Sequence, residues 1–126
     1  MTRKILSVIA GVVASALVIT LIEAVAFVLF PPGPLDARSG VPVSPPSTGL
    51  MLCVLAAWAA GALVGGWTAT KLARAAHGPA LAVGSMQTGA CIVNMIAIPS
   101  PWWFWVLGLG VSIPLALVGW RLARRP

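Results

Sequence analysis

Four stretches of mostly apolar residues alternate with short polar segments along the chain, at roughly 5–30, 49–70, 80–98 and 102–120. A helix needs about 20 apolar residues to cross the hydrocarbon core of a bilayer, so each stretch predicts one membrane-spanning helix. The first stretch is longer than this and is expected to tilt or to project beyond the lipid. Because short connections make neighbouring helices antiparallel, the pattern predicts an all-α, up-down antiparallel bundle of four helices, forming one membrane domain over residues 1–126.

The connecting segments carry helix-end signals. Gly78 and Pro79 are expected to close the second helix and to open the third, respectively. Ser100 and Pro101 fit the N-cap and the first position of the fourth helix. The longest polar segment, residues 31–48, is rich in proline and has no apolar periodicity, which predicts an extended, polyproline-rich strap on the outer surface.

The composition supports a membrane protein, and the positions of the charged residues predict its orientation in the membrane. The chain has 126 residues, of which 60% are hydrophobic and 8% charged, whereas soluble domains carry about 25% charged residues. The net charge of +6 comes from residues that flank the apolar stretches, which favours anionic lipid headgroups over nucleic acid as partners. Arg38 is the one basic residue expected on the outer side, and the other seven predict that both termini are cytoplasmic: Arg3, Lys4, Lys71, Arg74, Arg121, Arg124 and Arg125.

Small residues recur every four positions in three of the predicted helices. Gly61 and Gly65 form a GxxxG motif, Gly11 lies between Ser7 and Ser15, and Gly108 begins a similar series with Ser112 and Ala116. Such faces let helix backbones approach closely in a membrane. Two interpretations remain open, namely packing within the chain and contact between copies or with another protein.

Glu23 is the one acidic residue within an apolar stretch. It lies seven residues before Phe30, which places it about 10 Å below the outer end of its helix. An ionised carboxylate near the bilayer centre costs about 3 kcal/mol, so the group is expected to be protonated or hydrogen-bonded. It serves either a function of its own or as a cross-link between helices.

The third predicted helix supplies partners for Glu23. A polar face that includes Gln87 and Asn94 follows helical spacing, and Asn94 reaches a depth within about a turn of Glu23. Thr20 lies one turn below Glu23 on the same helix. The candidate intramembrane site is therefore Glu23, Thr20, Asn94 and Gln87, either as interhelical hydrogen bonds or as the lining of a small polar cavity.

Other chemistry has little support in the sequence. Cys53 and Cys91 lack C-x-x-C spacing and are expected to be free apolar thiols, although a thiol enzyme remains an alternative if the two meet. His77 has no second histidine or nearby acid with which to bind a metal. The sequence contains no cofactor motif and no catalytic constellation, so we expect no cofactor, no metal and no enzymatic activity.

Three segments resemble an uncharacterised family of small four-helix bacterial membrane proteins: IEAVAFVLFPPGP (22–34), AWAAGALVGGWTATKLA (57–73) and IPSPWWFWVLGLGVSIPLALVGWRLA (98–123). The resemblance implies four helices and a bacterial inner membrane, and it carries no known activity. Members of that family often have a histidine one turn after the glutamate, where this chain has Phe27.

Two functions follow from these features. The first is a non-enzymatic structural or accessory subunit, which packs against itself or a larger membrane-protein partner through its small-residue faces. The alternative is a small proton-linked transporter or ligand-binding membrane protein that uses Glu23.

Overall fold

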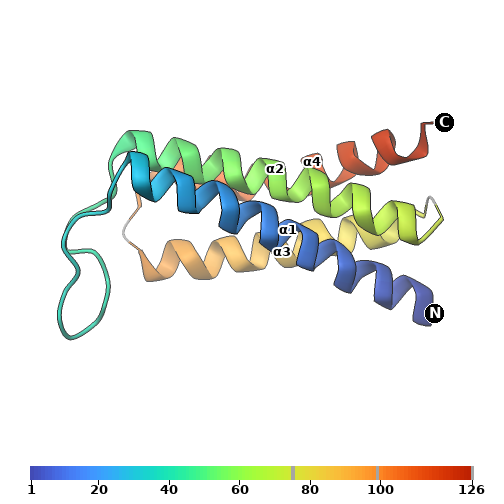
Figure 1. Cartoon of the computed structure of the whole chain (residues 1–126), viewed down its shortest axis with the longest axis horizontal. Helices are drawn as coiled ribbons and strands as arrows, with labels where there is room; N and C mark the ends of the chain where they lie inside the picture. Colours follow the sequence, from blue (N-terminus) through green and yellow to red (C-terminus); the bar gives the residue numbers. More distant parts are fainter. Residues whose placement is uncertain (75, 99, 126) are drawn as a thin grey trace.

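The structure is a computed structural model that describes residues 1–74, 76–98 and 100–125. It contains α1 (Thr2–Leu29), α2 (Thr48–Leu72), α3 (His77–Ala97) and α4 (Trp102–Arg124), and the described residues form no β-strand. Each helix is long and apolar enough to cross a membrane, which confirms the predicted all-α class and the four long apolar helices. Figure 1 shows both termini and the α2–α3 connection at one end of the molecule, and the long α1–α2 connection at the other.

The helices are arranged around α2, which packs against α1, α3 and α4. No described residue of α1 has its Cα atom within 8 Å of a Cα atom of α4. Half of the most apolar window of α2 is buried, compared with 17% for α1. The position of α2 follows from its many small residues, because Gly and Ala allow backbones to approach it from several sides.

The peripheral helix α1 turns its small and polar residues inward and its large apolar residues outward. Ser7, Gly11, Ser15 and Ala26 are its buried residues, whereas Ile9, Val13, Leu17 and Val25 are among its exposed ones. This distribution is the reverse of that in a soluble helix, and it is typical of helices surrounded by lipid, where large apolar side chains gain nothing from burial.

The glycines predicted to pack helices all lie against a neighbouring helix. A Cβ atom added to Gly11 would lie 2.7 Å from the carbonyl oxygen of Gly65, and one added to Gly65 would lie 2.8 Å from that of Gly11. Gly61 faces the side chain of Ile19, and Gly108 faces the ring of Trp58. These four positions are therefore occupied by contacts within the chain.

The closest approach of all, between α2 and α4, involves two glycines that the sequence analysis did not select. A Cβ atom on Gly66 would overlap the carbonyl group of Ala116, and one on Gly119 would overlap that of Leu63. Gly66 follows Gly65 directly, so at about 100° per residue it faces a different neighbour. The doublet thus lets α2 touch α1 with one glycine and α4 with the next.

The helix ends differ from several sequence predictions. The helix α2 begins at Thr48 after an N-cap at Ser47, whose side chain accepts a hydrogen bond from the Leu50 backbone N–H at 3.3 Å. It ends at Leu72, and Arg74 adopts a left-handed φ of 55°, so the prediction that Gly78 closes this helix is wrong. Gly78 and Pro79 instead lie in the first turn of α3, where the missing N–H of proline is tolerated.

Ser100 is not the cap of the fourth helix, as the sequence predicted. Its hydroxyl donates to the carbonyl oxygen of Ile98 at 3.0 Å, and Pro101 occupies the N-cap position. The extended backbone of Pro101, with ψ of 160°, directs the chain into α4 without a side-chain cap.

The connection between α1 and α2 folds back on itself and is not the uniformly extended strap that the sequence predicted. The backbone N–H of Asp36 donates to the carbonyl of Val41, and that of Val43 donates to Pro34, at 2.8 and 3.0 Å. The carboxylate of Asp36 accepts the N–H of Arg38 at 2.7 Å, and Gly40 takes the left-handed φ of 68° that the turn requires.

Candidate functional site

Glu23 lines a small cavity near the end of the bundle that carries the long α1–α2 connection. The cavity has a volume of about 80 Å³, and its polar side chains are Glu23 of α1, Asn94 of α3 and Ser100. Apolar side chains complete the wall: Phe27, Pro46, Leu50, Met51, Val54, Ile98 and Phe104. This space is enough for a few water molecules, and it is well below the roughly 300–1,000 Å³ of a site for an organic ligand.

The principal protein partner of the Glu23 carboxyl group is Trp58 of α2. The indole of Trp58 lies close enough to this carboxyl group to interact with it, and since indole N–H only donates, the carboxyl oxygen is the accepting group. Trp58 is 4% exposed, and its ring packs against that of Phe104 with centroids 5.3 Å apart. The contact between the two rings holds the indole in place, so the direction of its N–H is fixed.

Gln87 is the centre of a second polar group, in which one side chain reaches all three other helices. Ser15 of α1 donates to its Oε1 at 2.6 Å, and its Nε2 donates to the backbone oxygen of Trp58 in α2 at 2.6 Å. The same Nε2 lies 3.3 Å from the hydroxyl of Ser112 in α4. Because the Trp58 carbonyl only accepts, the amide orientation is fixed, and Gln87 cross-links the whole bundle.

The two polar groups meet at Trp58. Its side chain contacts Glu23, and its backbone carbonyl accepts a hydrogen bond from Gln87. A displacement of Trp58 would therefore disturb both contacts. Every buried side-chain nitrogen and oxygen atom among the described residues has a hydrogen-bond partner. The hydrogen-bonding side-chain groups of the interior are therefore all paired. Glu23 is the one ionisable carboxyl group that borders a cavity there.

The structure brings together only part of the predicted site. Glu23 and Asn94 share one cavity, and the exposure of Asn94 places this residue where the cavity meets the surroundings. Gln87 is buried in the separate network with Ser15 and Ser112. Thr20 is exposed and does not line the cavity, because it lies roughly 140° around α1 from Ser15, on the face away from the other helices.

Three residues of the site were not assigned a polar role from the sequence: Trp58, Ser15 and Ser112. The two serines belong to small-residue series that predict close packing, and their hydroxyls proved to be the partners of Gln87. The signal for this was their depth, since residues 15, 87 and 112 all lie near the middle of their helices. Trp58 lies in an otherwise apolar stretch, which offers no such signal.

The two cysteines do not form a disulfide. Both are free thiols, with Cys91 buried and Cys53 partly exposed. The sulfur of Cys91 lies 3.9 Å from the hydroxyl of Ser112, at the edge of the Gln87 network. This contact gives Cys91 a packing role between α3 and α4.

Comparisons with protein-family models, with curated proteins and with solved structures find no match to this chain.

Substitutions at Glu23 distinguish its hydrogen bond from its charge. We expect Glu23→Gln to retain wild-type stability, because the amide oxygen still accepts the indole N–H. Glu23→Leu is expected to lower the free energy of unfolding by about 1 kcal/mol, because it leaves the buried Trp58 donor without a partner. Reversible unfolding in mixed micelles, followed by tryptophan fluorescence, measures both changes.

A double-substitution cycle serves as the control. Trp58→Phe removes the donor, so in that background Glu23→Leu should cost distinctly less than it does in the wild type. Equal costs in the two backgrounds would show that Glu23 does not act through Trp58.

Proposed function

We propose that this protein is a non-enzymatic structural or accessory subunit of a bacterial inner membrane, in which it forms an antiparallel four-helix bundle. The observation that carries the proposal is the Gln87 network, which joins all four helices through one side chain. A bundle held in this way presents constant outer surfaces to a second copy or to a larger membrane-protein partner.

The same network argues against large helix movements. Alternating access in transporters requires one group of helices to rock against another. Here such a movement would break the hydrogen bonds of Gln87 inside the bundle, where the groups released have no water to bind. It would also separate the backbone contacts between Gly11 and Gly65 and between Gly66 and Ala116. A fixed scaffold fits these contacts better than a moving carrier does.

The outer face of α3 is the surface that we propose for contact with another chain. Ser85 and Gly89 are exposed one turn apart on this face, and a Cβ atom on Gly89 would meet nothing within 4 Å. Small residues spaced by four allow close approach of a second helix. The glycines of the other small-residue faces, including Gly61 and Gly65, are already in contact within the chain, so they leave this face for a partner.

We further propose that both termini face the cytoplasm. The proposal is supported by the seven basic residues in or next to the helix ends near the two termini and the α2–α3 connection, compared with Arg38 in the long α1–α2 connection. Figure 1 places both termini and the α2–α3 connection at one end of the molecule, so these charges gather at a single membrane surface.

Cysteine cross-linking in native membranes tests the proposed α3 face. In a background with Cys53 and Cys91 replaced by alanine, we expect oxidation of Gly89→Cys to yield a cross-linked species of higher mass than the 12.9 kDa chain. The reason is that an interface through this face brings residue 89 close to a thiol of a second copy.

The matched control is Val13→Cys, which places a thiol on the exposed face of α1, and it should remain uncross-linked. A hetero-partner is detected in the same membranes by mass spectrometry of the chain released in a mild detergent. A strictly monomeric chain, together with no cross-link at residue 89, would contradict the proposal.

A second function is favoured by the Glu23 cavity itself. A carboxyl group that borders a small cavity, with the Trp58 indole on one side and the exposed Asn94 on the other, is suited to binding a proton. Proton flux into liposomes that contain the purified chain tests this reading. Flux that Glu23→Gln abolishes would support it, and flux that Glu23→Gln leaves unchanged would exclude it.

A further inference from the structure

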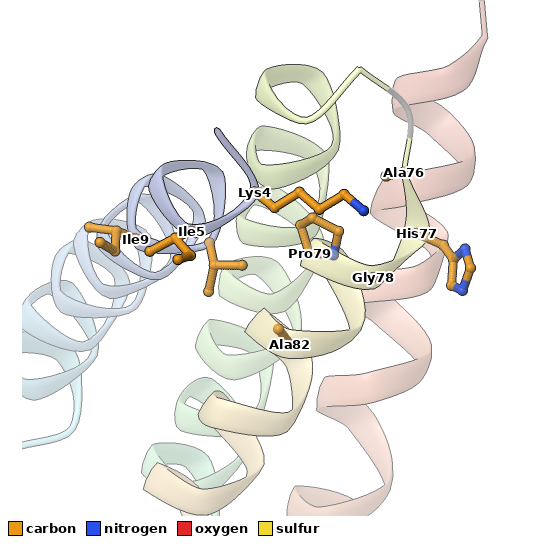
Figure 2. A pocket seen from close by; sticks show the side chains of 9 residues that line it. Lys4, Ile5, Ile9, Ala76, His77, Gly78, Pro79 and Ala82 are labelled. Carbon is orange, nitrogen blue, oxygen red and sulfur yellow. The ribbon is translucent and has the colours of Figure 1, made fainter. Parts of the chain in front are cut away.

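An apolar groove separates the first turns of α1 and α3 at the end of the bundle that carries both termini (Figure 2). Its volume is about 460 Å³, which lies within the range of sites that bind ligands. Ile5, Val8 and Ile9 line it from α1, and Pro79 and Ala82 line it from α3. The two helices enclose a slot with apolar walls, open on one side, where a flexible hydrocarbon chain can lie.

One cation stands at the mouth of this groove. Figure 2 shows the side chain of Lys4 extended along the start of α3 beside Pro79, while the ring of His77, a residue that also lines the groove, points away from Ile5 and Ile9. The imidazole of His77 is engaged elsewhere, since it packs edge-on against Trp120 with centroids 5.9 Å apart. The groove thus has apolar walls and the positive charge of Lys4 at its end.

No acidic side chain of this protein can neutralise that charge. Its two acidic residues are Glu23 and Asp36, and both lie at the opposite end of the bundle, in the last turns of α1 and in the long α1–α2 connection. The first turn of α3, next to Lys4, has no side-chain cap, so its partial positive charge adds to that of the lysine. Because no acidic side chain lies near Lys4, an external anion can approach its charge without competition from a carboxylate side chain.

We propose that this groove binds an anionic phospholipid, with an acyl chain between α1 and α3 and the phosphate held by Lys4. The apolar walls exclude free inorganic phosphate as the natural occupant, because it would leave Ile5, Val8 and Ile9 without a partner. The position at the end of two membrane-spanning helices matches the level at which headgroups meet acyl chains. Ala82 lies three and seven residues before Ser85 and Gly89, so the groove is on the same side of α3 as the proposed contact face, one to two turns nearer the start of the helix.

Native mass spectrometry of the delipidated full-length chain tests the proposal with two probes, phosphatidylglycerol and phosphatidylcholine of identical acyl chains. The wild type is expected to bind phosphatidylglycerol more tightly. Lys4→Gln should weaken phosphatidylglycerol binding roughly fivefold, as for the loss of one lysine at a membrane surface, and should leave phosphatidylcholine binding unchanged. Arg125→Gln removes an equal charge outside the groove and should change neither affinity.

A second pair of variants tests the acyl-chain slot. Ala82→Phe fills the groove and should weaken the binding of both lipids, whereas Ala24→Phe adds the same ring to an exposed position of α1 outside the groove and should not. Circular dichroism verifies that the variants are folded, and if Ala82→Phe is not, the lysine pair decides alone. Equal losses for Lys4→Gln and Arg125→Gln, or displacement of the lipid by inorganic phosphate alone, would overturn the proposal.

Discussion

Replacement of Gln87 by leucine is expected to lower the free energy of unfolding by roughly 2–4 kcal/mol, although the two side chains have similar size. Interhelical hydrogen bonds in membranes average about 0.6 kcal/mol and reach about 1.7 kcal/mol, and Gln87 makes three such contacts. The substitution also leaves the hydroxyl of Ser15 facing an apolar side chain. Reversible unfolding in mixed micelles, or steric trapping in bicelles, measures the loss.

Thr88→Val is the matched control for this substitution. The hydroxyl of Thr88 lies next to Gln87 in the sequence but donates to the carbonyl of Gly84 within its own helix, at 2.8 Å. Its removal should cost less than about 0.5 kcal/mol, since no other helix loses a contact. If the two substitutions cost the same, Gln87 does not cross-link the bundle, and the main support for the scaffold function is lost.

The fold was predictable from the sequence to the extent that hydropathy determines it. Four long apolar stretches can cross a bilayer only as helices, because helices satisfy all their backbone groups internally. The helix ends were less predictable, since they depend on single dihedral angles. Arg74 adopts the left-handed conformation that usually belongs to glycine, and Ser100 bonds backward to Ile98 where a forward cap was expected.

The depth of the site residues along their helices was predictable from the sequence, but the directions in which their side chains point were not. Counting residues from the helix ends placed Glu23 and Asn94 at one level, and they do share a cavity. The same counting cannot give the rotation of α1 about its axis, which turns Thr20 outward. It also could not show that Gln87 would bind Ser15 and Ser112, because that requires all three helices to be placed around α2.

Alanine at Gly66 is expected to cost about 1–3 kcal/mol, the range for forcing extra atoms into a packed interior. The added methyl group would overlap the backbone carbonyl of Ala116, and a backbone cannot move aside as a flexible side chain can. The helices α2 and α4 must therefore separate along their contact. Reversible unfolding of Gly66→Ala measures the cost. The substitution adds no atom to the lipid-facing surface, because Gly66 is buried between α2 and α4.

Gly110→Ala provides the control, because this glycine lies in α4 with nothing within 4 Å of its added Cβ atom. It should be neutral or slightly stabilising, since alanine is the better helix former. Gly119→Ala affects the same α2–α4 contact from α4, because its added methyl group would overlap the backbone carbonyl of Leu63 in α2. Once Gly66→Ala has separated the helices, the second substitution should cost less than it does alone. Strict additivity would instead mean that the two glycines relieve independent contacts, and that α2 and α4 do not move as rigid bodies.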